Sequence, residues 1–166
     1  GACFTPGCAD QYTKIGRYSS IARDVRILNI NHPMNMKSTH GFFFNSLVNV
    51  CEKDLCEWTP ITIGNDVWIG HGTTIMPSVT EIGNGAIIAA GAVINKNIPP
   101  YAVAVGNPAR VVRFRFPKET IEELLASKWW EKDIEELKPT LEEEFQVPYE
   151  QLIAQREGKQ DRDICA

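Results

Sequence analysis

Histidine is the residue type in this 166-residue chain that is best suited to exchange a proton near neutral pH. The three histidines are His32, in the run Asn31-His32-Pro33-Met34, then His40, and His71, which follows Ile69-Gly70. A histidine on the wall of a cleft can serve as a general base, whereas an isolated one is more often an ordinary surface residue. The elements that carry each histidine therefore decide whether it takes part in chemistry.

Cysteines give a second indication of chemistry. The chain has five, at positions 3, 8, 51, 56 and 165, and an odd number without CxxC spacing does not indicate a disulfide framework. Cys51 and Cys56 share one segment and are able to pair or to bind a metal, although reduced thiols without a function fit the pattern better. We find no signal peptide and no apolar run of the ~18 residues that span a membrane, so we predict a cytoplasmic protein.

A repeat of six residues organises the middle of the chain. Neither a helix nor a strand has this period, so the chain must turn a corner at regular intervals. Coils stacked in this way form a parallel β-helix. The same residues would otherwise be strand residues of a β-sandwich, but their regular spacing and the Gly and Asn residues at fixed offsets favour the β-helix. The repeating residues are Ile63, Ile69 and Ile75, then, after one extra residue, Ile82, Ile88 and Ile94.

Three blocks of six make one triangular coil, which predicts how the coils stack. We expect Ile63 to lie under Ile82, Ile69 under Ile88, and Ile75 under Ile94. An earlier coil contains Ile15, Ile21 and Ile27, which have the same spacing. Residues 33–60 lose the pattern and form a loop from one corner, beginning just after His32. We assign residues 1–116 to this β-helix domain.

The chain changes character after Pro117, where the composition favours helices. Residues 118–130 place Ile121, Leu124 and Leu125 on one side of a helix. We predict a second short helix at 133–137 and a third at 149–156, so that residues 117–157 form a helical segment able to cap the β-helix. Residues 158–166 are polar and form a flexible tail. The net charge of −4 argues against a nucleic-acid partner.

Residues 61–70 (ITIGNDVWIG) and 105–110 (VGNPAR) resemble segments of the hexapeptide-repeat acyltransferases. The resemblance is closest to the xenobiotic acetyltransferase branch, which includes type B chloramphenicol and streptogramin A acetyltransferases and O-acetyltransferases of surface polysaccharides. Residues 31–34 resemble the catalytic-histidine segment of this family, and residues 115–130 resemble its C-terminal helices. The resemblance implies a mainly β protein: a left-handed parallel β-helix with an extended loop after the first coil and a C-terminal helical segment.

The same resemblance implies a mechanism. His32 is the expected general base, which takes a proton from an acceptor hydroxyl so that the oxygen attacks the thioester of acetyl-CoA. The other ring nitrogen of His32 should be held by a carbonyl or a carboxylate, which fixes the tautomer. A backbone N–H near Gly70 or His71 is expected to stabilise the oxyanion.

The resemblance also implies where the donor and the acceptor bind. Acetyl-CoA would lie along the prism between two subunits of a homotrimer, beside the small residues 89–91, with cations pairing to its phosphates. The acceptor is a small molecule or glycan, either a sugar or polysaccharide precursor or an antibiotic, and aromatic side chains suit both. The expected donor contacts are Ala90, Asn95, Lys96, Arg110 and Arg113, and the expected acceptor contacts are Tyr18, Phe43, Trp68 and His71.

Two other functions remain open from the sequence. A non-catalytic scaffold would explain the isoleucines without a role for His32. A zinc hydratase of the γ carbonic anhydrase type would need His32, His40 and His71 to converge on a metal, and the chain lacks the close histidine pair of that family. We therefore expect no metal.

Overall fold

The computed structural model describes residues 12–48 and 51–145. The chain divides into two compact units, the first ending at Lys128 and the second beginning at Trp129. The start of the expected β-helix domain, the third helix predicted at 149–156 and the tail at 158–166 lie outside the described residues.

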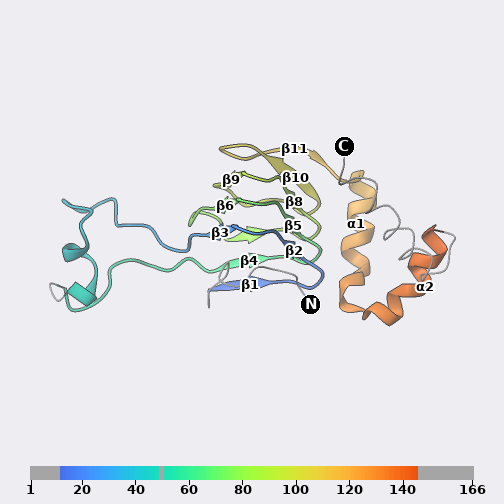
Figure 1. Cartoon of the computed structure of the whole chain (residues 1–166), viewed down its shortest axis with the longest axis horizontal. Coiled ribbons are helices and arrows are strands. Elements are labelled where there is room, and N and C mark those ends of the chain that lie inside the picture. Colours follow the sequence, from blue (N-terminus) through green and yellow to red (C-terminus); the bar gives the residue numbers. More distant parts are fainter. Residues whose placement is uncertain (1–11, 49–50, 146–166) are drawn as a thin grey trace, which may run out of the picture. The chain divides into compact units, whose positions relative to one another are not determined.

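Nine short strands of the first unit stack as successive coils of a three-sided parallel β-helix (Figure 1). Each coil contributes one strand to each of three sheets, and strands from successive coils pair in parallel within a sheet. The first sheet has the order β1-β4-β7, the second contains β2-β5-β8, and the third has the order β3-β6-β9. The strands are β1 (Thr13–Ile15), β2 (Ser20–Ile21), β3 (Arg26–Ile27), β4 (Ile61–Ile63), β5 (Trp68–Ile69), β6 (Thr74–Ile75), β7 (Glu81–Ile82), β8 (Ile87–Ile88) and β9 (Val93–Ile94).

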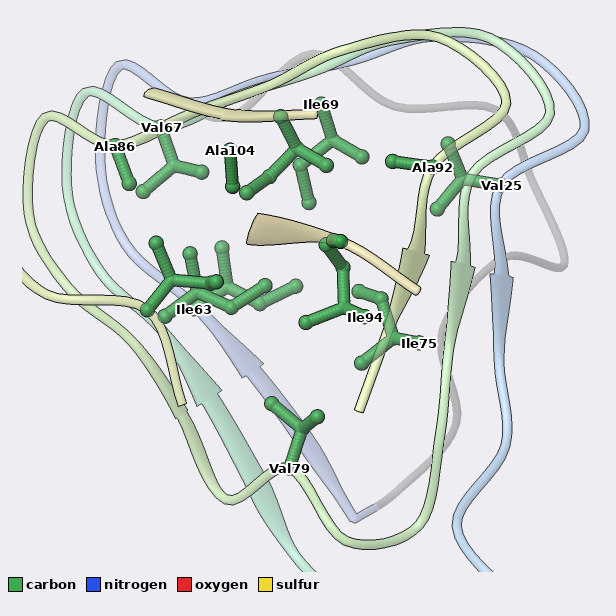
Figure 2. Close-up of a cluster of buried hydrophobic side chains, with 14 of the residues drawn as sticks. Val25, Ile63, Val67, Ile69, Ile75, Val79, Ala86, Ala92, Ile94 and Ala104 are labelled. Carbon is green, nitrogen blue, oxygen red and sulfur yellow. The ribbon is translucent and has the colours of Figure 1, made fainter. Parts of the chain in front are cut away.

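The isoleucine columns have the predicted register. In the three sheets the pairings run Ile15–Ile63–Ile82, Ile21–Ile69–Ile88 and Ile27–Ile75–Ile94. The isoleucines of the second and third coils are almost completely buried. From all three sheets they point into one shared interior, as Ile63, Ile69 and Ile75 show (Figure 2). Because each buried isoleucine contributes about 1.5–3 kcal/mol, these columns are the main source of stability in the coil. The β-helix is therefore confirmed over the sandwich.

Three corners join the sheets, and we number them in chain order. The first corner joins β1 to β2, β4 to β5 and β7 to β8. The second joins β2 to β3, β5 to β6 and β8 to β9. The third joins β3 to β4 and β6 to β7, and also follows β9. Val67, Val25 and Val79 fill the interior at the first, second and third corners respectively (Figure 2).

The long loop leaves the stack after β3, at the third corner, and returns at β4 (Figure 1). Its base is closed by two hydrogen bonds: the Thr59 N–H donates to the Asn29 carbonyl (2.7 Å), and Asn29 Nδ2 donates to the Thr59 carbonyl (3.0 Å). The loop therefore begins some residues before the predicted start at residue 33. It contains two short 3₁₀ helices, η1 (Gly41–Phe43) and η2 (Ser46–Val48).

The last coil ends in a hairpin that the hexapeptide pattern did not predict. Strand β10 (Ala102–Val105) pairs in parallel with β8, and β11 (Arg110–Phe114) pairs antiparallel with β10. Helix α1 (Lys118–Ser127) follows and ends at Lys128, which is in the left-handed conformation with φ of 46°. The helix predicted over 118–130 is therefore shorter, because the backbone turns at Lys128.

In the second unit, η3 (Trp129–Glu131) precedes helix α2 (Ile134–Phe145). The prediction of a short helix at 133–137 was wrong in length, because the helix continues through Pro139. A proline inside a helix removes one backbone hydrogen bond, and here the helix extends past that loss.

Candidate active site

The imidazole of His32 is exposed in the loop but is held in one orientation. Its Nδ1 lies 2.8 Å from the carbonyl oxygen of Thr39, and its ring centroid lies 4.7 Å from that of Phe44, with 55° between the planes. Phe44 is itself buried, so it offers a firm surface to the imidazole. Because a carbonyl only accepts hydrogen bonds, Nδ1 must carry the proton, which leaves the lone pair of Nε2 free to act as a base. The expected carbonyl partner is thus present.

The loop around His32 is held by local hydrogen bonds. His40 caps η1, with its Nδ1 accepting from the Phe42 N–H (3.3 Å), so this histidine has a structural contact of its own. Asp54 Oδ1 accepts from the N–H (2.7 Å) and the hydroxyl (2.8 Å) of Ser46. Those two hydrogen bonds lower the pKa of the Asp54 carboxyl, since they stabilise its charged form.

The two described cysteines are free thiols, also in this loop. Desolvation raises the pKa of the Cys56 thiol, and the charge of Asp54 raises it further. A thiol with a raised pKa is a poor nucleophile at neutral pH. In the part of the chain that the structure describes, no three His, Cys, Asp or Glu side chains are grouped to hold a metal ion, so the geometry does not support the hydratase alternative.

The structure distributes the expected acceptor contacts over several surfaces of one prism. Tyr18 lies at the first corner, Trp68 points outward from β5 with 56% of its surface exposed, and His71 lies at the second corner. His71 Nδ1 is 3.7 Å from Oδ2 of Asp24 in the coil below, and both side chains are largely exposed. Since His32 belongs to the loop at the third corner, one prism does not bring these groups together.

Within the loop, the aromatic residue that contacts His32 is Phe44, whereas Phe43, which we predict as an acceptor contact, is half-exposed. The run Phe42-Phe43-Phe44 does not show which ring turns inward, so no signal in the sequence could single out Phe44. The carbonyl of Thr39 carries no signal of side-chain type at all.

Three of the five expected donor contacts line one pocket. Asn95, Lys96 and Arg110 lie around a cavity of about 130 Å³ at the third corner of the last coils. Oδ1 of Asn95 is buried and accepts no hydrogen bond from the described part of the protein, and Lys96 and Arg110 are exposed cations. A ligand that carries both N–H donors and phosphates, such as coenzyme A, suits this set.

The other two donor contacts lie elsewhere on the coil. Ala90 is exposed at the second corner, beside Gly91, where an added Cβ would meet no atom within 4 Å. Arg113 lies on β11 opposite Val103 and is exposed. Open space beside small residues suits a narrow chain such as the pantetheine arm.

One of the two expected oxyanion donors is not available. The Gly70 N–H donates to the Ile88 carbonyl at 2.8 Å, as part of the ladder between coils. The expectation of a donor near Gly70 or His71 is therefore wrong in its Gly70 part, because this amide is already bonded.

Comparisons with known proteins agree with the hexapeptide-repeat coil. The six-repeat bacterial transferase hexapeptide family matches residues 60–96. The chain is 38% identical over 143 residues to a probable macrolide acetyltransferase of Lysinibacillus sphaericus, covering 77% of this chain and 74% of that protein. It is 38% identical over 133 residues to a chloramphenicol acetyltransferase of Agrobacterium fabrum, covering 76% of this chain and 63% of that protein.

A solved structure with the same fold is a serine-to-alanine mutant of AntD, an N-acyltransferase from Bacillus cereus, in complex with dTDP-4-amino-4,6-dideoxyglucose and coenzyme A. The TM-score is 0.53 at 17% identity, over 76% of this chain and 64% of that one.

The chain belongs to the hexapeptide-repeat acetyltransferases. Membership of this family implies that the three-sided coil winds left-handed. The chain spans less than two thirds of the length of the chloramphenicol acetyltransferases that it matches. No helix among the described residues is long and apolar enough to cross a membrane.

Proposed function

We propose that the protein is an acetyl-CoA-dependent O-acetyltransferase with His32 as its general base. The observation that carries this proposal is the hydrogen bond between His32 Nδ1 and the Thr39 carbonyl, which leaves Nε2 as the proton acceptor. A tautomer fixed in this way is what a base needs before its substrate arrives. Membership of an acetyltransferase family supplies the reaction class.

The reaction then proceeds by direct transfer. Nε2 of His32 takes the proton of the acceptor hydroxyl as the oxygen attacks the thioester carbonyl. The tetrahedral oxyanion accepts a hydrogen bond from a backbone N–H, for which His71 is the remaining candidate. Collapse of the intermediate breaks the C–S bond, and the imidazolium returns its proton to the leaving sulfur. No enzyme thiol is needed, consistent with the raised pKa of Cys56.

Acetyl-CoA is bound by residues at two corners of the coil and on β11. Asn95 Oδ1 accepts a hydrogen bond from acetyl-CoA. The phosphates of acetyl-CoA pair with Lys96, Arg110 and Arg113, and Ala90 leaves room for the pantetheine arm. The free thiols and an acetyl-CoA donor fit a cytoplasmic location.

The active protein is a homotrimer with its sites between subunits. Three different corners of the coil carry Tyr18, His71 and the loop with His32. One subunit therefore cannot enclose an acceptor with all three groups. A neighbouring copy brings one corner against another, as cyclic symmetry allows. Trp68 and the aromatic residues of the loop, including Phe43, then line the acceptor pocket.

The acceptor is a hydroxyl compound of one of two classes. Relatives named as chloramphenicol and macrolide acetyltransferases favour an antibiotic, and the exposed aromatic side chains suit a sugar equally well. The test is a panel with chloramphenicol, a macrolide, simple sugars and glycan precursors, which follows thiol release from acetyl-CoA.

Thermal unfolding separates this enzyme from a non-catalytic scaffold without knowledge of the acceptor. We expect acetyl-CoA to raise the midpoint of unfolding, and to raise it further as its concentration increases, because it binds only the folded protein. A midpoint that does not move at millimolar acetyl-CoA would favour the scaffold.

A further inference from the structure

Strand β11 is an exposed edge strand that carries two of the proposed phosphate-binding cations, Arg110 and Arg113. All five of its residues are exposed, and within its sheet it pairs only with β10 (Figure 1). A strand with few buried contacts opens readily. A guanidinium on such a strand binds tightly only if the strand is held in place beforehand.

The residue after β11, Arg115, is fixed by contacts in several directions. Its N–H donates to the Tyr101 carbonyl at 2.8 Å. Its Nη1 donates to Oδ2 of Asp66 at 2.9 Å and to the Gly85 carbonyl at 2.8 Å. Its guanidinium carbon lies 5.4 Å from the ring centroid of Tyr101 and 5.2 Å from that of Phe116. Only 26% of the Arg115 side chain and 29% of the Asp66 side chain are exposed, so water screens this ion pair less than an open one.

These contacts connect β11 to three successive coils. Asp66, Gly85 and Tyr101 occupy the same left-handed position of the first corner, with φ of 56°, 69° and 56°. A Cβ added to Gly85 would collide with the ring of Tyr101, so glycine is what lets that ring lie over the corner. Arg115 runs along this corner and joins the carboxylate of one coil, the carbonyl of the next and the ring of the last.

We propose that Arg115 is a positioning residue for the coenzyme: it anchors β11 so that Arg110 and Arg113 are presented to the phosphates. Arg115 is not expected to touch the ligand, since its own hydrogen bonds are made to Asp66 and Gly85. This inference rests on the proposed function, because it assumes that the β11 arginines bind a phosphorylated donor.

The test is calorimetric binding of coenzyme A at several salt concentrations to the wild type, Arg115→Met and Arg23→Met. Arg23 is an exposed cation of the first coil, so its substitution makes the same chemical change away from β11. We expect Arg115→Met to weaken binding about tenfold, as the loss of one charge-assisted contact would. We also expect it to flatten the salt dependence, because fewer phosphates are then paired. Arg23→Met should leave both unchanged.

A second variant covers the case in which Arg115→Met fails to fold. Asp66→Asn removes the charge of the partner and keeps its size, and asparagine accepts the left-handed conformation of this position. We expect a smaller loss of affinity in the same direction, with faster hydrogen exchange at the amides of 110–114.

The outcomes separate the two proposals. If the wild type binds coenzyme A and both variants bind it equally well, the role of Arg115 is wrong. A loss of affinity with unchanged salt dependence and unchanged exchange in β11 would also refute it, since the effect would then be one of general stability. If the wild type itself does not bind coenzyme A, the proposed function fails and this inference fails with it.

Discussion

At the scale of single residues, the proposed site depends on one oriented imidazole and one unpaired amide oxygen. His32 is oriented by a main-chain carbonyl, and the Asn95 amide oxygen is left without a donor among the described residues. An unpaired buried acceptor costs about 1–3 kcal/mol, so a ligand that supplies a donor there gains that energy. The cavity beside Asn95, where we propose that acetyl-CoA binds, is thus suited to a polar ligand.

Lys96 gives the prediction that isolates phosphate binding. We expect Lys96→Met to raise the KM for acetyl-CoA about tenfold or more while kcat stays near the wild-type value, because a charge-assisted hydrogen bond contributes about 1.5–3 kcal/mol. Lys14→Met, at an exposed position of the first coil, is the matched control. Steady-state kinetics check both, and an unchanged KM in Lys96→Met would remove Lys96 from the donor site.

At the scale of elements, the inward face of a strand contributes more to the free energy of unfolding than its outward face does. Ile88 is 1% exposed, whereas its neighbour Ile87 in β8 points outward and is half-buried. We expect Ile88→Ala to lower the free energy of unfolding by about 2–5 kcal/mol, because it leaves a cavity in the isoleucine column. Ile87→Ala should cost only about 1 kcal/mol. Urea denaturation of both variants checks this, and equal losses would contradict the assigned register.

Close contact between coils gives a second prediction at this scale. A Cβ added to Gly70 would collide with the backbone nitrogen of Ala90. We expect Gly70→Ala to destabilise the protein by about 1–3 kcal/mol, since backbone cannot move aside as a side chain can. Gly41→Ala is the control, because an added Cβ there meets no atom within 4 Å. Thermal unfolding of the pair decides, and a neutral Gly70→Ala would show that the coils are packed less closely.

The strands and the loop also show how much of this fold the sequence predicts. A period of six predicts the coil and the pairing of the isoleucine columns, because a corner at regular intervals places the isoleucines of successive coils in register. It does not predict β11, which breaks the period and turns antiparallel. It also does not show that Phe44 packs on His32, since the loop has no repeat and its form depends on contacts such as Asp54 with Ser46.

At the scale of the whole molecule, the central feature is that one prism separates the groups that the proposed reaction requires together. His32 lies in the loop of the third corner, whereas Ala90 and His71 lie at the second. Their roles are therefore expected to be shared between neighbouring subunits of the proposed homotrimer.

Subunit mixing tests this sharing. We expect His32→Ala and Ala90→Trp each to be inactive alone, the first for lack of a base and the second because a bulky ring fills the donor channel. In randomly mixed trimers, about a quarter of the sites should be active. Each active site needs an intact His32 from one subunit and an intact Ala90 from its neighbour, and each condition is met about half the time. Activity assays after joint refolding check this. No recovery, in trimers shown to be mixed by mass, would place both residues in a site within one subunit.

Acceptor-dependent thiol release from acetyl-CoA by the wild type, His32→Ala and His40→Ala measures whether His32 is the general base. His40 is the matched control, since it is an exposed histidine of the same loop whose contact is to η1. We expect a loss of about 10²–10⁴-fold in kcat for His32→Ala, with the fold intact by circular dichroism, and at most a few-fold loss for His40→Ala. Undiminished turnover in folded His32→Ala would show that His32 is not the general base.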